Sequence, residues 1–134
     1  IFNSVFKFTF VRNPWDWQVS LYHYILEHPE NHGHEETKRM GGFRNFVFSR
    51  ENLDFTQTGC LVDESGCLLV DFVGRFENLE ADFKISCDKV GITASLPHIY
   101  KSDRRGYRDY YDPETRDITA RLYAEDIERF GYTF

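Results

Sequence analysis

Arg12 and Ser20 are the residues whose types and spacing best suit the binding of a phosphate group. Arg12 directly follows a segment with the apolar alternation of a β-strand, and Ser20 lies in a helix expected to begin at Pro14. A guanidinium is a forked, charged donor and a hydroxyl is a neutral one, so the two can bind one phosphate. Because helix side chains lean toward the helix N-terminus, Ser20 leans toward Arg12 along roughly 10 Å of axis. The same spacing is also compatible with an ion-paired Arg and a solvated Ser.

A strand, a tight turn and a helix are the elements expected to position these residues. In residues 5–11 three phenylalanines alternate with smaller residues, and Lys7 is the only charged residue of the segment. A strand that is apolar on nearly both sides is typical of a sheet covered by helices on both faces. Asn13 has the side chain of a helix cap, Pro14 suits the first helical position, and the helix is expected to end near Glu27.

The helix that begins at Pro14 is apolar around most of its circumference. Apart from Gln18, its polar residues form one narrow stripe with spacings of 4, 3 and 4: Asp16, Ser20, His23 and Glu27. This pattern predicts a mostly buried helix with one strip in contact with water. The strip begins beside the carboxyl end of the strand, where α/β sheets present their ligand sites.

Strands and helices alternate along the rest of the chain, which predicts an α/β fold in a single domain, residues 1–134. A polar, histidine-rich loop is expected over residues 28–42, followed by a short helix. Residues 58–73 have the pattern of a β-hairpin. One helix is predicted over residues 78–90, and a single last helix over residues 112–131.

Composition excludes several classes of function. The chain carries 16 basic and 22 acidic residues, a net charge of −6, whereas nucleic-acid binders present a basic face. An aromatic share of 17% argues against disorder. No apolar run in the sequence approaches the ~20 residues that span a membrane, and no signal peptide is visible.

Neither the cysteines nor the histidines predict a metal site. Cys60, Cys67 and Cys87 have no metal-ligand spacing, which favours reduced, partly buried thiols, and a bridge between the first two stays open. The histidines of residues 28–42 lie near two glutamates, but a flexible polar loop near an acceptor pocket is the favoured interpretation. We therefore expect a protein without a metal.

The segment 10–22, FVRNPWDWQVSLY, resembles the 3′-phosphate-binding segment of sulfotransferases, which use 3′-phosphoadenosine 5′-phosphosulfate (PAPS) as sulfuryl donor. The family pattern is an Arg, a Pro two residues later and a Ser eight residues after the Arg, and Arg12, Pro14 and Ser20 match it. By this resemblance, Arg12 and Ser20 bind the 3′-phosphate of the donor.

Further stretches resemble the family in the same order: 70–79, VDFVGRFENL; 110–115, YYDPET; and 126–132, DIERFGY. The resemblance therefore covers nearly the whole chain, and it is greatest to carbohydrate-type and bacterial sulfotransferases. It implies a P-loop-kinase-like parallel sheet flanked by helices.

A basic loop after Pro97 is the second region of interest. In the family, a loop at this point closes over the 3′-phosphate and the adenine. The resemblance assigns four loop residues to the cofactor: Lys101, Ser102, Arg104 and Arg105. The family often reads Pro-His-x-Asn-x-Ser here, and in this chain Tyr100 replaces the Asn. A solvated charged loop, partly neutralised by nearby aspartates, is the alternative.

The 5′-phosphosulfate loop of the family has no counterpart in the sequence. That loop carries a Lys or Arg at a helix start, where backbone N–H groups point at the anion. Gly33, Gly41 and Gly42 lie in a polar loop without a strand before them. The catalytic base of the family, a His or Glu, tends to lie upstream of the Arg12 strand. We therefore expect the C-terminal part of the fold, incomplete at its N-terminus, with the catalytic residue unassigned.

The resemblance implies a PAPS-dependent enzyme that transfers a sulfuryl group to an acceptor hydroxyl or amine, a carbohydrate being one candidate. The product of the donor is adenosine 3′,5′-bisphosphate. Two alternatives stay open: a phosphotransferase of the P-loop-kinase type, and a noncatalytic remnant that binds nucleotide or another protein. Few cysteines and no visible signal favour a cytoplasmic protein, although a Golgi enzyme trimmed of its anchor would have the same appearance.

Overall fold

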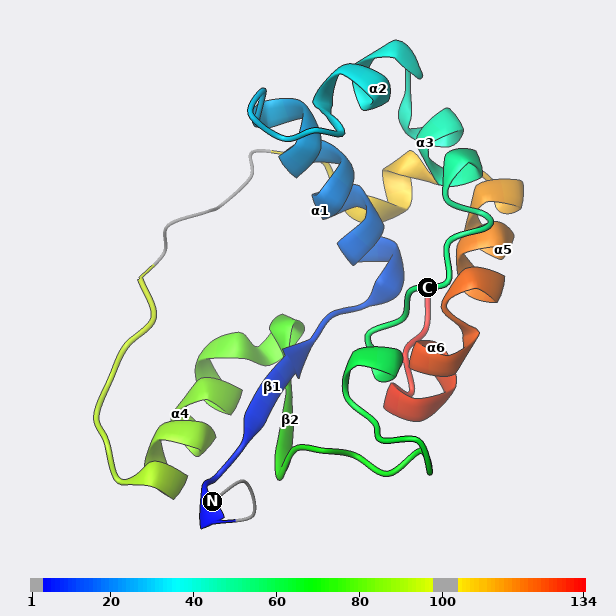
Figure 1. The fold of residues 1–134 in the computed structure, drawn as a ribbon. Coiled ribbons are helices and arrows are strands. Elements are labelled where there is room, and N and C mark those ends of the chain that lie inside the picture. Colours follow the sequence, from blue (N-terminus) through cyan, green and yellow to red (C-terminus); the bar gives the residue numbers. More distant parts are fainter. Residues whose placement is uncertain (1–3, 98–103) are drawn as a thin grey trace. The chain divides into compact units, whose positions relative to one another are not determined.

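The computed structural model describes residues 4–97 and 104–134, so the predicted loop residues Lys101 and Ser102 lie outside the described residues. The fold is mixed α/β, with a two-stranded parallel sheet and helices (Figure 1). Two compact units make up the chain. The first, here called the strand unit, comprises Ile1–Arg12 and Gln57–Lys101, and the second, the helical unit, comprises Asn13–Thr56 and Ser102–Phe134. A single domain stays a prediction.

The sheet of the strand unit pairs β1 (Phe8–Val11) with β2 (Phe72–Arg75) in parallel. β1 is shorter than the predicted strand over residues 5–11. Phe6, Phe8 and Phe10 lie on one face, as the alternation predicts, and the centroids of consecutive rings are 6.0 Å apart. The pairing of β1 with β2 confirms a parallel sheet.

A close approach between β1 and β2 depends on Gly74 of β2. A Cβ atom at Gly74 would lie 2.5 Å from the Phe10 ring and 3.1 Å from the Cβ of Asp82. Asp82 belongs to α4 (Leu79–Val90), which contacts β2 and ends at a left-handed glycine, as predicted. The Asp82 carboxylate accepts a hydrogen bond of 2.6 Å from the backbone N–H of Arg75. One carboxylate thus ties the end of β2 to the helix that follows it.

The predicted hairpin over residues 58–73 is confirmed only at its turn. Asp63 accepts hydrogen bonds from the backbone N–H groups of Ser65 and Cys67, at 2.9 and 3.0 Å, and a single antiparallel bridge follows. A short 3₁₀ helix, η2 (Thr58–Cys60), takes the place of the start of the first arm, and Leu61 and Val62 keep the pairing with residues 68–69. The second arm was wrong because β2 pairs with the distant β1, and local alternation does not identify the partner of a strand.

The three cysteines are free thiols, as predicted, and no bridge joins Cys60 to Cys67. Both of these residues are exposed, so the expectation of partial burial was wrong for them. Cys87 on α4 is buried.

The helical unit contains five α-helices among the residues that the structure describes. They are α1 (Pro14–Glu27), α2 (His34–Arg39), α3 (Phe43–Ser49), α5 (Pro113–Leu122) and α6 (Ala124–Phe130). α1 has the predicted bounds, and the Asn13 side chain caps it by accepting a hydrogen bond from the Trp15 N–H at 3.0 Å. α2 lies in the stretch predicted as a loop. Its sequence, HEETKR, has no apolar residue and hence no hydrophobic period that could have indicated a helix.

The predicted last helix over residues 112–131 is two helices, because the backbone leaves helical geometry at Tyr123. Asp112 caps the first of them through a capping box with Thr115, and Gly131 ends the second at a φ of 66°, as predicted. Tyr123 is fully buried, with its ring against that of Trp17 at 5.6 Å. Tertiary packing of this side chain accompanies the break and overrides the local helix propensity.

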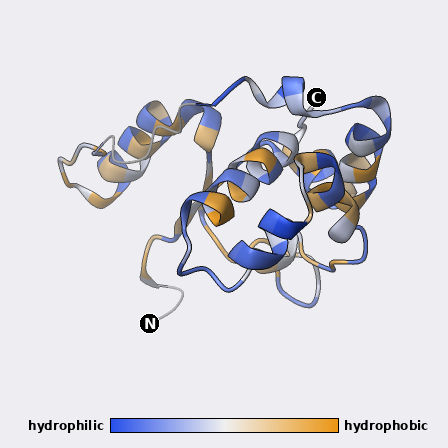
Figure 2. Ribbon diagram, turned by 90° about the horizontal axis from the view of Figure 1, so that it is seen from above, coloured by the Kyte–Doolittle hydropathy of each residue, from blue (hydrophilic) through white to orange (hydrophobic). Residues whose placement is uncertain are grey.

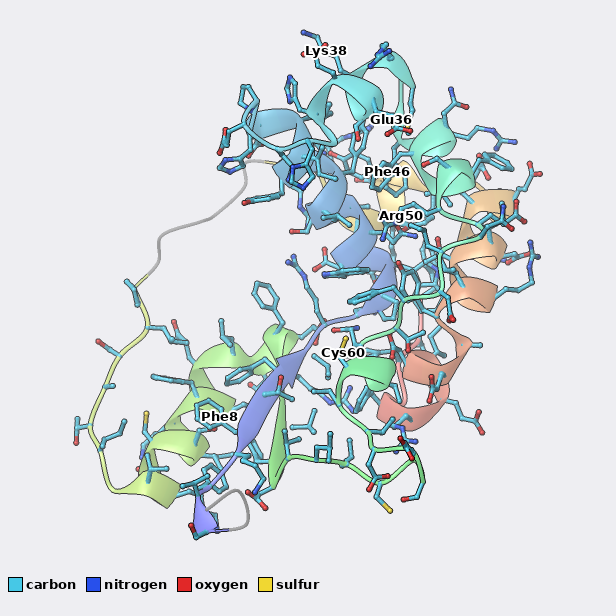
Figure 3. The ribbon with its side chains drawn as sticks, viewed as in Figure 1. Phe8, Glu36, Lys38, Phe46, Arg50 and Cys60 are labelled. Atoms are coloured by element: carbon cyan, nitrogen blue, oxygen red, sulfur yellow. The ribbon has the colours of Figure 1, made fainter. Side chains whose placement is uncertain are left out.

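The core of the helical unit lies among α1, α3 and α5. Its buried apolar residues are Val19, Ile25, Phe43, Phe46, Val47 and Ile118. Figure 2 shows hydrophobic and hydrophilic positions interspersed along the helices of the chain, as expected for amphipathic elements. Phe46 and Arg50 lie together (Figure 3), with the Arg50 guanidinium 5.4 Å from the Phe46 ring centroid. Within the described part of the chain, no helix combines the length and the apolar character that a membrane span requires.

Candidate functional site

Arg12 directly follows β1, and the side chain of Gln57 holds its main chain. The Arg12 N–H donates to Oε1 of Gln57 at 2.8 Å, and Nε2 of Gln57 donates to the Arg12 carbonyl at 2.8 Å. The Arg12 guanidinium lies over the ring of Phe76, 4.0 Å from its centroid. The strand unit therefore fixes both ends of Arg12.

Ser20 lies half-buried on α1 of the helical unit. Since Arg12 belongs to the strand unit, the joint binding of one phosphate by Arg12 and Ser20 stays a prediction.

Three tertiary hydrogen bonds hold the N-terminal turn of α1 within the helical unit. Nδ2 of Asn13 donates to the Thr133 carbonyl at 2.9 Å, and the indole N–H of Trp15 donates to the Arg116 carbonyl at 3.1 Å. The Tyr111 hydroxyl donates to the Trp15 carbonyl at 2.9 Å. The helix that carries Ser20 is therefore fixed at the end where the predicted site begins.

Two residues of the polar stripe of α1, Asp16 and His23, contact the segment 104–110, so this part of the stripe is less exposed to water than predicted, whereas Glu27 is exposed. Asp16 accepts a hydrogen bond of 2.5 Å from the Arg104 guanidinium, and the two side chains are only 18% and 10% exposed. Farther along the stripe, Nε2 of His23 lies 2.8 Å from the Tyr110 hydroxyl oxygen. Ser20 occupies the stripe between these two contacts.

Arg104 and Arg105 have different surroundings in this segment. The charge of Arg104 is paired with Asp16 inside the helical unit. Arg105 is exposed, and its guanidinium lies over the Tyr110 ring at 4.8 Å from the centroid. Arg104 thus contacts the helix that carries Ser20, whereas Arg105 contacts Tyr110 of its own segment.

The surroundings of His23 favour its neutral form. Burial lowers its pKa below the ordinary value, the nearby charges of Arg104 and Arg105 lower it further, and Glu27 opposes the shift. A neutral imidazole has one nitrogen that donates and one that accepts, so it can share the Tyr110 hydroxyl proton or accept a proton from a ligand hydroxyl.

Two histidines of the stretch over residues 28–42 make hydrogen bonds within the helical unit. Nδ1 of His34 lies 3.0 Å from the Ile25 carbonyl near the end of α1, and His28 lies 2.7 Å from Glu30. In residues 4–97 and 104–134, no group of three or more potential metal ligands comes together.

Sequence reasoning missed the partners that hold the predicted residues in place. Gln57 lies 45 positions from Arg12, and Asp16 lies 88 positions from Arg104. Both contacts join segments that are distant in sequence, and no local spacing indicates them.

The comparisons with known proteins agree with these motifs. Residues 1–133 match the sulfotransferase family. One relative, an uncharacterized protein of Archaeoglobus fulgidus, is 34% identical over 100 residues, which cover 72% of this chain and 76% of that protein. No solved structure matches the chain. Because the family match extends over nearly all residues, including those that hold Arg12 and Ser20, the chain belongs to the sulfotransferase family.

Proposed function

We propose that the protein is a sulfotransferase that moves a sulfuryl group from PAPS to an acceptor hydroxyl or amine, and that this chain binds the 3′ end of the donor. The family match over residues 1–133 carries the proposal. Within that match, Arg12, Pro14 and Ser20 keep the spacing of a 3′-phosphate-binding segment. We propose a carbohydrate hydroxyl as the first acceptor to test.

Arg12 and Ser20 have the chemistry that a terminal phosphate requires. The guanidinium of Arg12 offers two parallel N–H donors and a permanent positive charge, and the Ser20 hydroxyl adds a neutral donor. Support for this role comes from the way Gln57 and Phe76 fix Arg12.

The basic segment after Pro97 completes the proposed nucleotide site. We assign Arg105 to the anion in preference to Arg104, because Arg105 is exposed and its guanidinium rests on Tyr110. Arg104 supports the segment through its ion pair with Asp16. Lys101 and Ser102 are assigned to the cofactor by family resemblance alone.

The reaction itself is an in-line displacement at sulfur. The acceptor oxygen or nitrogen forms a bond to sulfur while the bond from sulfur to the bridging phosphate oxygen breaks. The acceptor proton passes to a base, and negative charge develops on the bridging oxygen of the departing adenosine 3′,5′-bisphosphate. Firm binding of the 3′-phosphate contributes by orienting the donor for this displacement.

Calorimetric titration with adenosine 3′,5′-bisphosphate and with AMP tests the proposal. The bisphosphate should bind at least about tenfold more tightly, since only it carries the phosphate that a charged, bidentate contact recognises. Arg12→Ala should abolish this preference while leaving the affinity for AMP nearly unchanged. Equal affinity of the unaltered protein for the two nucleotides would refute a 3′-phosphate site.

A transfer assay and a titration with ATP distinguish the two alternatives. A noncatalytic remnant prefers the bisphosphate but transfers no radiolabelled sulfuryl group from PAPS to any of a panel of sugars, phenols and amines. A P-loop-kinase-type phosphotransferase instead binds ATP more tightly than adenosine 3′,5′-bisphosphate.

A further inference from the structure

Gln57 contacts Arg12 as a neighbouring strand would. The pairing of β1 with β2 ends at Val11, and the next residue has its N–H and its carbonyl bound by one side-chain amide, both at 2.8 Å. Gln57 is itself held in place, because it precedes the short helix η2, whose first residue, Thr58, is fully buried. The main chain of Arg12 is therefore fixed beyond the end of the sheet.

Phe76 supports the other end of Arg12. It directly follows β2, whose last residue, Arg75, is tied to α4 by Asp82. The ring is 43% exposed, and the Arg12 guanidinium lies 4.0 Å from its centroid. Attraction between a cation and an aromatic ring uses none of the guanidinium N–H groups as hydrogen-bond donors to that ring. Such a support orients the guanidinium without competing for its donor fork.

We propose that Gln57 and Phe76 are positioning residues for recognition of the 3′-phosphate. Gln57 sets the origin of the Arg12 side chain, and Phe76 sets the direction of its guanidinium. An arginine loses considerable rotamer freedom when it is ordered, and a side chain that is already ordered loses less on binding. The inference rests on the proposed function, because it assumes that Arg12 contacts the 3′-phosphate.

Gln57→Met tests the first contact, since it keeps the length of the side chain and removes both hydrogen bonds to Arg12. The affinity for adenosine 3′,5′-bisphosphate should fall about tenfold, as expected for the loss of two hydrogen bonds that order one group. The affinity for AMP should stay within about twofold, because AMP lacks the phosphate that Arg12 recognises. A residue with a purely structural role would weaken both nucleotides alike.

Gln18→Met is the matched control for this substitution. Gln18 on α1 is fully buried, and its amide has no hydrogen-bond partner among the described residues. The same chemical change therefore removes no hydrogen bond there, and the preference for the bisphosphate should persist.

Phe76→Leu tests the second contact and also covers the case in which Gln57→Met fails to fold. The position is partly exposed, so the fold should tolerate leucine, and the preference for the bisphosphate should fall about threefold with loss of the cation–π contact. Circular dichroism identifies variants that have unfolded.

The outcomes separate the two proposals. If the unaltered protein binds adenosine 3′,5′-bisphosphate no more tightly than AMP, the proposed function is overturned, and this inference with it. A preference that survives both Gln57→Met and Phe76→Leu overturns the positioning role alone, whereas a selective loss of bisphosphate affinity in the folded variants supports it.

Discussion

Replacing Gly74 by alanine should destabilise the strand unit through a clash that the structure locates. The new methyl group would lie 2.5 and 2.7 Å from two atoms of the Phe10 ring, whereas carbon atoms in contact normally lie about 3.5–4.0 Å apart. The ring or the strand must therefore move by about 1 Å, and overpacking of this kind costs about 1–3 kcal/mol. Asp82, 3.1 Å from the methyl, would also be displaced from its hydrogen bond to Arg75, adding about 1 kcal/mol.

Urea unfolding followed by circular dichroism measures this effect, and Gly106→Ala is the matched control. A Cβ atom at Gly106 would meet only an Asp109 carboxylate oxygen at 3.8 Å, which is an ordinary contact. We expect Gly74→Ala to lower the free energy of unfolding by about 2–4 kcal/mol, and Gly106→Ala to change it by less than about 1 kcal/mol. A loss below about 0.5 kcal/mol for Gly74→Ala would refute the close contact between Gly74 and the Phe10 ring.

Two further predictions concern the helical unit. Asp16→Asn should lower the free energy of unfolding by about 2–3 kcal/mol, because the carboxylate that pairs with the largely buried Arg104 is lost. Asp117→Asn, which removes an exposed ion pair, should lower the free energy of unfolding by less than about 0.5 kcal/mol. If urea titrations gave equal losses for the two variants, the ion pair of Asp16 with a largely buried Arg104 would be contradicted. The pKa of His23 is lowered in the folded state, so the unfolded state binds the proton at a higher pH than the folded state does. The contribution of His23 to stability is therefore complete above the ordinary histidine pKa, and it is lost as the pH falls from there through the lowered pKa of the folded state. The His23→Gln variant should therefore lose less stability than the unaltered protein between pH 7 and pH 5, and an equal loss would count against a lowered pKa of the half-buried His23.

Local signals predicted those elements that local forces determine. α1 was predictable to the residue because Asn13, Pro14 and the apolar pattern all lie within the helix or next to it. The break at Tyr123 could not be predicted, because it accompanies packing against Trp17, more than a hundred positions away. The same limit applies to the sheet, where β2 lies beside a strand from the start of the chain.

The chemistry of the candidate site stays a prediction from the sequence, whereas the contacts that support its residues are visible only in the structure. Arg12 and Ser20 followed from residue type, spacing and family resemblance. The contacts that hold the site residues, such as Gln57 on Arg12 and Asp16 on Arg104, join distant segments through single side chains. A lone glutamine between polar residues has no periodicity, so only the folded chain identifies its partner.

The pair of hydrogen bonds between Arg12 and Gln57 also marks an insertion point. The first segment of the strand unit ends at Arg12 and its second segment begins at Gln57. The intervening residues 13–56 belong to the helical unit, and the two hydrogen bonds join the ends of this insertion. Doubling the length of a closed loop costs only about 0.6 kcal/mol of chain entropy. Insertions or deletions between α1 and η2 can therefore change the helices without breaking the two hydrogen bonds between Arg12 and Gln57, so related chains can diversify the segment 28–56 while Arg12 keeps its place.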